Sequence, residues 1–383
     1  MTAHQVTIAM NGVTGRMGAT QHLERSIAAI RRQGGVALDN GDTVWPEVVL
    51  VGRNADKLRA LADRHGIDRW STDLGDVLAD EGVDVYFDAQ RTSLRADGVR
   101  RALDAGKAVY CEKPLAEDAA TAMDLARHAA GTGVVTGIVQ DKLYLPGMRK
   151  LRRLLDLGFF GRILSVRCEF GYWVFPGDVE PAQRPSWNYR TEDGGGIMLD
   201  MYPHWQYLLE GLFGRIRSVC CHATTHVLER VDESSRRYAA TADDAAYGLF
   251  ELSDGVVVQI NSSWATRVYR DELVEFHVDG THGSAVAGLR ECRVQPAGAT
   301  PRPTWNPDVP NPIDFRAGWL EVPDLGADEN GFKVQWEDFL RAVAAAEPYT
   351  HDLSAGARGL QLVDVASQSS RERRWIDMPE WDQ

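Results

Sequence analysis

The chain has 383 residues, of which 44% are hydrophobic, and it carries a formal net charge of −13. Because single hydrophobic cores stop growing at about 250–300 residues, this length predicts a globular protein with two domains. The acidic balance and the lack of a dense run of Lys and Arg argue against a nucleic acid or an anionic membrane as partner. A small molecule is the expected partner.

The amino terminus does not have the pattern of a targeting segment. Residues 1–10 lack the basic region and the long apolar stretch of a signal peptide, and no later window holds about 18 consecutive apolar residues. We therefore expect a cytoplasmic protein. The five cysteines form no CxxC pair and are expected to be reduced and mostly buried.

No metal site is expected. His222 and His226 are four residues apart, but their segment is strand-like, and residues at this spacing on a strand lie about 13 Å apart. Asp200 and His204 lack an evident third ligand.

Residues 1–139 alternate short apolar runs with segments of helical period, which is typical of a parallel sheet covered by helices. The strand-like runs are residues 6–10, 48–51, 83–87, 108–111 and 134–139. The helical segments between them are residues 17–32, 56–65, 95–105 and 119–130. The fold class is therefore α/β, and the first domain is predicted to be a doubly wound, dinucleotide-binding (Rossmann) domain.

The pattern changes in residues 140–383, which we predict to form a second, α/β domain. A helix over residues 146–157 precedes a series of strands with Gly and Asp turns between the later ones, which indicates an antiparallel sheet. These strands are residues 163–172, 216–226, 245–251, 256–263 and 273–278. Residues 296–323 are rich in Pro and are expected to form an irregular surface loop before a helix at 332–346.

A glycine-rich turn lies at the first strand-to-helix junction. Glycines allow a tight turn and close approach of the backbone, and a helix amino terminus offers unpaired N–H groups to a pyrophosphate. The residues of this turn expected to contact the cofactor are Gly12, Val13, Thr14, Gly15, Arg16 and Met17. The spacing up to Gly18 is G-x-x-G-x-x-G rather than G-x-G-x-x-G, so an ordinary strand-to-helix turn is the alternative.

The end of the second predicted strand bears on the choice of nucleotide. Chains that bind NAD usually place Asp or Glu there for the ribose hydroxyl, whereas this chain has Arg53 and Asn54. Arg53, with Lys57 one turn later, can pair with a 2′-phosphate, so we expect NADP(H) to be preferred over NAD. The alternative is that Arg53 stacks on adenine or is solvated.

Two segments carry groups that handle protons. Asp200 and His204 lie four residues apart at the start of a predicted helix, so their side chains share a face. Lys113 follows the strand-like run 108–111, whose end should border the cofactor crevice. These groups together suit hydride transfer between a nicotinamide and an alcohol. An ordinary hydrogen-bonded Asp–His pair is the alternative, and Pro203 between them is expected to kink the helix.

In their order along the chain, these motifs resemble the Gfo/Idh/MocA family of nicotinamide-dependent oxidoreductases. The resemblance rests on the glycine loop, Glu112-Lys113-Pro114, and residues 158–163, 187–190, 194–204 and 280–284. It covers nearly the whole chain. It implies a carboxy-terminal domain with a large, mostly antiparallel open sheet for substrate binding and oligomerisation, and hence a homodimer or homotetramer.

The resemblance also implies a catalytic centre of Lys113, Asp200 and His204. We assign His204 as proton acceptor in oxidation and proton donor in reduction, with Lys113 hydrogen-bonded to the same substrate oxygen. Asp200 would orient the substrate and His204. Lys113 and His204 can exchange roles, and the sequence does not decide between them.

Further binding residues are expected, some from the same resemblance and some from their residue types. Expected cofactor contacts besides the glycine loop, Arg53 and Asn54 are Gln90, Glu112, Lys113 and Gln140. Gln90 is included because the chain lacks the Thr-Pro that relatives commonly carry there, so that loop is expected to be built differently. Expected substrate contacts besides the catalytic centre are Lys142, Tyr172, Trp173, Asn188 and Tyr189, with Phe175 in the same aromatic group. The alternatives are a surface position for Lys142 and a core position for the aromatic residues.

We expect an NAD(P)-dependent oxidoreductase that acts on a secondary alcohol or ketone of a monosaccharide, cyclitol or sugar derivative. Some relatives instead use NAD as a tightly held redox catalyst for glycoside hydrolysis or elimination, without net change of the cofactor. A non-catalytic, nucleotide-binding regulator is the third alternative, which does not need the proton-handling residues.

Overall fold

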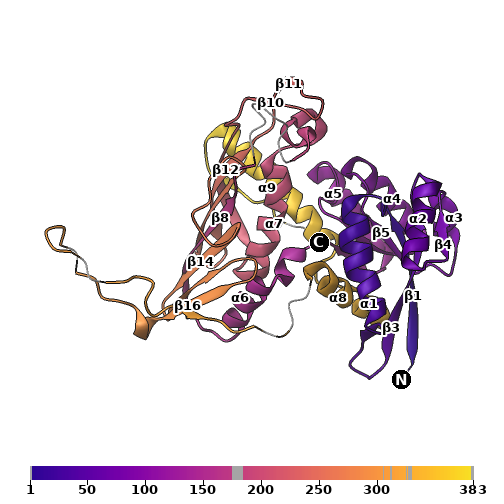
Figure 1. Ribbon diagram of the computed structural model, residues 1–383, viewed down its shortest axis with the longest axis horizontal. Coiled ribbons are helices and arrows are strands. Elements are labelled where there is room, and N and C mark those ends of the chain that lie inside the picture. Colours follow the sequence, from indigo (N-terminus) through magenta and orange to yellow (C-terminus); the bar gives the residue numbers. More distant parts are fainter. Residues whose placement is uncertain are drawn as a thin grey trace.

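The computed structural model describes residues 2–174, 184–304, 306–310, 313–324, 326 and 330–380. It contains two large sheets, with helices α7 (Ile197–Leu212) and α9 (Leu353–Glu372) between them (Figure 1). None of the helices in these ranges is both long enough and apolar enough to cross a membrane.

The first sheet has seven strands, and each pairs in parallel except β2. The strand order is β2-β3-β1-β5-β6-β7, and β4 also pairs with β3. The strands are β1 (Ala3–Asn11), β2 (Val36–Ala37), β3 (Thr43–Val51), β4 (Arg69–Ser71), β5 (Val85–Asp88), β6 (Ala108–Cys111) and β7 (Thr136–Ile138). Its helices are η1 (Met17–Ile27, a π-helix), α1 (Ala28–Arg32), α2 (Ala55–His65), α3 (Leu74–Ala79), α4 (Thr92–Asp104) and α5 (Ala119–Thr132). The predicted Rossmann domain is confirmed; β2, β4 and α3 were not predicted because runs this short show no clear period.

The second sheet has nine strands in the order β17-β16-β15-β14-β8-β13-β12-β9-β18. All neighbours in it are antiparallel except β8 and β13. In chain order these strands are β8 (Ile163–Gly171), β9 (Ile216–Thr224), β12 (Ala245–Leu252), β13 (Val257–Ser263), β14 (Val274–Gly280), β15 (Gly283–Ala287), β16 (Cys292–Pro296), β17 (Leu320–Glu321) and β18 (Ile376–Asp377). The five predicted strands are all present, and a separate hairpin is formed by β10 (Glu229–Val231) and β11 (Arg237–Ala239).

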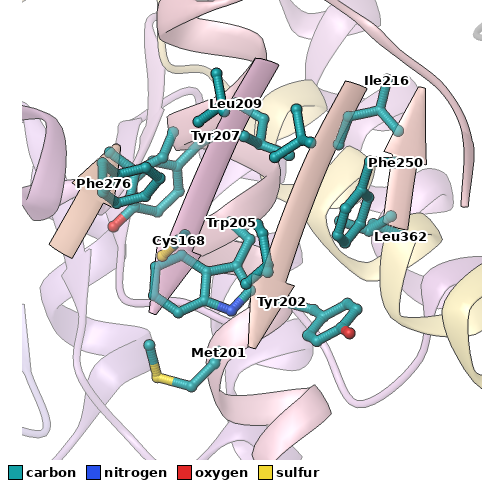
Figure 2. Close-up of a cluster of buried hydrophobic side chains, with 14 of the residues drawn as sticks. Cys168, Met201, Tyr202, Trp205, Tyr207, Leu209, Ile216, Phe250, Phe276 and Leu362 are labelled. Atoms are coloured by element: carbon teal, nitrogen blue, oxygen red, sulfur yellow. The ribbon is translucent and has the colours of Figure 1, made fainter. Parts of the chain in front are cut away.

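Helix α7 is the central element of the second core. Figure 2 shows Met201, Tyr202 and Trp205 of this helix among side chains of the sheet, including Phe250 and Phe276. Twelve of the 16 residues of α7 are buried, so the helix is enclosed on nearly every side. Helix α7 continues without a break through Pro203, so the proline does not end the helix.

The chain returns to the first domain after the second sheet. Helix α8 (Gly331–Ala345) adds Trp336, Phe339 and Leu340 to the core of the Rossmann sheet. Helix α9 contributes Leu353, Ala357 and Leu360 to a core shared with α5 and β7, and it also packs on α7 and β9. The sequence pattern predicted α8 but not α9. Buried polar residues such as Arg358, Gln361 and Ser369 blur the apolar period of α9.

The cysteines are free, as expected, and four of the five are buried; Cys220 is half-buried. Helix α6 (Pro146–Asp156) matches the predicted helix before the second sheet.

Candidate active site

The glycine-rich turn joins β1 to η1. Gly12 has a φ of 80°, and a Cβ there would lie 2.6 Å from backbone atoms of the loop that follows β5. A Cβ on Gly18 would lie 2.7 Å from the carbonyl oxygen of Gly12. Both positions therefore require glycine, whereas Gly15 has room for a side chain. Because Thr14, Gly15 and Arg16 are exposed at this turn, the backbone forms an open cradle that fits a pyrophosphate.

The residues at the end of β3 differ in their availability to a cofactor. The Asn54 side chain accepts a hydrogen bond from the main-chain N–H of Lys57 at 2.9 Å and so caps α2. Arg53 is exposed on the same turn. Of the two predicted contacts, Asn54 thus caps the helix, and Arg53 is exposed.

The loop after β5 is held by a buried ion pair. Arg95 donates to Asp88 Oδ1 at 3.3 Å, and both side chains are almost fully buried. Asp88 Oδ1 also accepts the main-chain N–H of Gln90 at 2.9 Å, and Arg95 donates to the carbonyl oxygens of Gln90 and Pro114. This network ties the loop at Gln90 to the segment that follows β6, which carries Lys113.

Glu112 lies at the centre of a second buried network. Its Oε1 is 2.8 Å from His22 Nε2, and its Oε2 accepts the main-chain N–H of Lys113 at 3.1 Å. Trp336 donates its indole N–H to His22 Nδ1 at 3.0 Å. Because an indole nitrogen can only donate, Nδ1 of His22 accepts and Nε2 carries the proton donated to Glu112. The predicted cofactor residue Glu112 is therefore part of the framework that holds Lys113.

Lys113 from the first domain meets Asp200 from α7. Its Nζ lies 3.0 Å from Asp200 Oδ1 and 3.0 Å from the Asp200 carbonyl oxygen. Arg184 donates to the other carboxylate oxygen, Oδ2, at 2.9 Å. Burial acts to raise the pKa of the Asp200 carboxyl, but the charges of Lys113 and Arg184 outweigh burial and hold that pKa below its ordinary value. Asp200 thus stays a carboxylate between two cations.

His204 lies one turn further along α7 and is 4% exposed. Its Nδ1 is 2.6 Å from the hydroxyl of Tyr207, and within the described ranges Nε2 has no hydrogen-bond partner. Burial, with the positive charges of Lys142, Lys113 and Arg184, holds the pKa of the imidazole well below its ordinary value. The expected contact between Asp200 and His204 is not among the hydrogen bonds of the residues that the structure describes; Tyr207 takes its place.

The remaining predicted residues lie in different surroundings. Asn188 accepts from Arg184 at 3.3 Å, and the charge of Lys142 acts on His204, so both lie near the centre. Tyr189 is fully buried between Arg230 and Trp264, which is a core position. Tyr172 and Trp173 are half-buried at the end of β8, Gln140 is buried beside Gln335, and Phe175 lies outside the described residues.

Several residues of these networks, among them Tyr207, Arg184, His22 and Trp336, were not predicted from the sequence. Tyr207 could have been found, because it lies three residues after His204 on one predicted helix. Arg184 stacks on Trp264 at 4.3 Å and contacts Asp200 from an irregular segment. Because this segment has no periodic pattern, its contacts could not be predicted from the sequence. His22 and Trp336 are 314 residues apart, so no local signal joins them.

Comparisons with known proteins agree with this fold. Residues 6–139 match the family model described as "Oxidoreductase family, NAD-binding Rossmann fold", and residues 148–286 match that of the "GFO/IDH/MocA C-terminal domain". The chain belongs to the Gfo/Idh/MocA family of oxidoreductases. Within this family its first domain is the NAD-binding domain and its large sheet belongs to the C-terminal domain.

Individual relatives extend the comparison. The chain is 57% identical to a D-xylose dehydrogenase of Paenarthrobacter nicotinovorans over 98% of both proteins. It is 22% identical to a levoglucosan dehydrogenase of Pseudarthrobacter phenanthrenivorans, over 88% of this chain and 92% of that protein. A solved structure of levoglucosan dehydrogenase with NADH and levoglucosan has a TM-score of 0.80 at 21% identity, over 98% of this chain and 100% of that chain. At that identity the structural match shows the shared fold.

Proposed function

We propose that this protein is an NAD(P)-dependent dehydrogenase that oxidises a CH–OH group of D-xylose or a closely related monosaccharide. The observation that carries the proposal is the convergence of Lys113, Asp200 and His204 from two domains at the end of β6. The substrate class is supported by the 57% identity to a D-xylose dehydrogenase over nearly the whole of both chains.

Each residue of the centre has a distinct part in this reaction. When bound, the nicotinamide supplies the acceptor for the hydride. Lys113 and His204 hold the substrate oxygen, stabilise the negative charge that develops on it and provide the route for its proton. Asp200 keeps Lys113 in place through Oδ1, while Arg184 holds Oδ2 and so fixes the carboxylate.

The direct test is the reduction of the cofactor by sugars. D-xylose with NAD or NADP should yield reduced cofactor, and Lys113→Met should lower kcat by about 10²–10⁴-fold with cofactor affinity near normal. Lys150→Met is a matched control, because Lys150 is buried in an ion pair with Asp324, outside the centre. Unchanged kcat in Lys113→Met, or sugar product without net reduction of cofactor, would contradict the proposal.

For the cofactor we propose a preference for NADP(H). The exposed Arg53 and the nearby Lys57 can pair with a 2′-phosphate, and the side chain of Asn54 is already used as a helix cap. Arg53→Ser should therefore lower kcat/KM for NADP more than for NAD, whereas Arg59→Ser, on the helix that carries Lys57, should change neither. A wild-type kcat/KM ratio in favour of NAD would refute this preference.

We also propose that the protein forms a homodimer or homotetramer through the open face of the second sheet. Tyr247, Leu249 and Val257 occupy this face at 39%, 43% and 50% exposure, on the neighbouring strands β12 and β13. Light scattering of the wild type should give a mass of two or four chains, and Leu249→Lys should reduce it.

A further inference from the structure

Helix α7 places a tyrosine hydroxyl against the catalytic histidine. His204 Nδ1 and the Tyr207 hydroxyl oxygen are 2.6 Å apart, and each residue is 4% exposed. The two rings meet edge to face, with centroids 5.5 Å apart and an interplanar angle of 86°. Neither ring can turn to solvent, so each hydrogen-bonding group must find its partner inside the protein.

The surroundings of Tyr207 decide which of the two groups donates. The main-chain N–H of Lys142 points to the Tyr207 hydroxyl oxygen at 3.4 Å, and an N–H can only donate, so this oxygen accepts there. Among the described residues, the remaining hydrogen-bond partner of the Tyr207 hydroxyl is His204 Nδ1. A buried O–H without an acceptor is strongly unfavourable, so the hydroxyl donates to Nδ1.

The protonation states agree with this direction. Burial raises the pKa of Tyr207 well above its ordinary value, so the phenol keeps its proton. The pKa of His204 is well below its ordinary value, so the ring is neutral and carries one proton. With Nδ1 accepting, that proton is on Nε2.

We propose that Tyr207 is a positioning residue that fixes the tautomer of His204, so that Nε2 presents an N–H to the substrate oxygen. This inference rests on the proposed dehydrogenase function for its substrate, but the tautomer itself does not depend on it. In this state His204 donates a hydrogen bond to the reacting oxygen, which leaves Lys113 as the neighbouring group that can accept the proton of that oxygen in oxidation. Lys113 can do so only as the neutral amine, after its own ammonium proton has passed to solvent. The structure thereby favours Lys113 over His204 as the group that exchanges this proton, a choice that the sequence leaves open.

The tautomer can be measured without substrate. In ¹⁵N NMR of the histidine-labelled protein, with the His204 signals identified from their loss in His204→Phe, Nε2 should carry the proton and Nδ1 should not. Tyr207→Phe removes only the hydroxyl and should shift the population toward the other tautomer. A proton on Nδ1 in the wild type, or an unchanged tautomer in Tyr207→Phe, would overturn the proposal.

Kinetics provide a second readout. Tyr207→Phe should lower kcat for D-xylose about tenfold, with the KM for the cofactor unchanged. Tyr349→Phe is the matched control, because it also removes a buried hydroxyl, one that lies 3.3 Å from the Tyr144 hydroxyl. A kcat for Tyr207→Phe equal to that of the wild type would contradict the positioning role. A wild type inactive on sugars but with the expected tautomer would refute the proposed function alone.

Discussion

The protein buries two histidines in hydrogen-bonded networks, one in the Rossmann domain and one in helix α7. His22, in the Rossmann domain, has both ring nitrogens paired, with Trp336 on one side and Glu112 on the other. His204, in α7, has Tyr207 on Nδ1, and Nε2 has no partner in the described part of the chain. The same side chain is therefore a fixed support in one region and an open donor in the other.

This difference shows how a buried polar group becomes available for chemistry. A buried ring with both nitrogens satisfied contributes to stability and has no group left to offer a ligand. A ring held through one nitrogen is oriented but keeps the other for a substrate. Four experiments, from the largest expected effect to the smallest, test this contrast.

The paired substitution of each histidine should give the largest difference. His204→Phe removes the donor beside the substrate oxygen and should lower kcat by about 10²–10³-fold. His22→Phe should change kcat by less than about tenfold, because His22 acts through Glu112 and touches no reacting atom. Steady-state kinetics on D-xylose measure both, and equal losses in the two variants would remove the contrast.

The support role of His22 predicts a loss of stability when its indole partner is changed. Trp336→Phe leaves Nδ1 of His22 without its donor and makes a cavity in the first core, so the free energy of unfolding should fall by about 3 kcal/mol. Urea unfolding measures this change. The half-exposed Trp375 is the control, since Trp375→Phe should alter the unfolding free energy by less than about 0.5 kcal/mol.

A third histidine, His351, has no part in the proposed reaction and therefore tests the effect of burial on a pKa by itself. Burial lowers the pKa of His351 to about 4, from an ordinary value of about 6.5. As the pH falls, the unfolded chain binds this proton at a higher pH than the folded protein does. The free energy of unfolding is therefore not reduced by His351 above about pH 6.5, and it decreases as the pH falls toward 4.

Replacement of His351 should remove that dependence. Relative to His351→Gln, the wild type should lose about 2 kcal/mol of unfolding free energy between about pH 7.5 and pH 5. Urea unfolding at the two pH values measures the loss. Parallel pH curves for the two proteins would show that His351 does not titrate as its burial requires.

The smallest effect is expected for Arg184, the positively charged residue of the site that the sequence did not predict. Arg184→Met removes one of the two charges that keep the pKa of Asp200 low, so that pKa should rise and the acidic limb of kcat/KM should move to higher pH. We expect kcat at neutral pH to fall about tenfold. Arg236→Met, which removes an exposed cation paired with the buried Asp232, should leave the pH profile in place. If both profiles coincide with the wild type, Arg184 does not tune Asp200.

Much of the first domain followed from local pattern. The alternation of apolar runs and helical segments, with glycines at one junction, predicted the strands, the main helices and the cradle at Gly12. The run that ends in Lys113 and the spacing of Asp200 and His204 predicted which groups to examine. These features are local, since each depends on residues within a few positions of one another.

The sequence by itself thus determined the α/β fold class and the family, and it predicted the residue types of the centre. The tertiary structure decided how those residues are joined: Lys113 and Asp200 are 87 residues apart, and His22 and Trp336 are 314 apart. It also gave His204 a tyrosine rather than Asp200 as partner, and gave Asp200 a second cation. Hydrogen bonds and ion pairs form between groups that packing brings within about 3 Å of one another. The separation of two residues along the sequence does not show whether packing brings them that close.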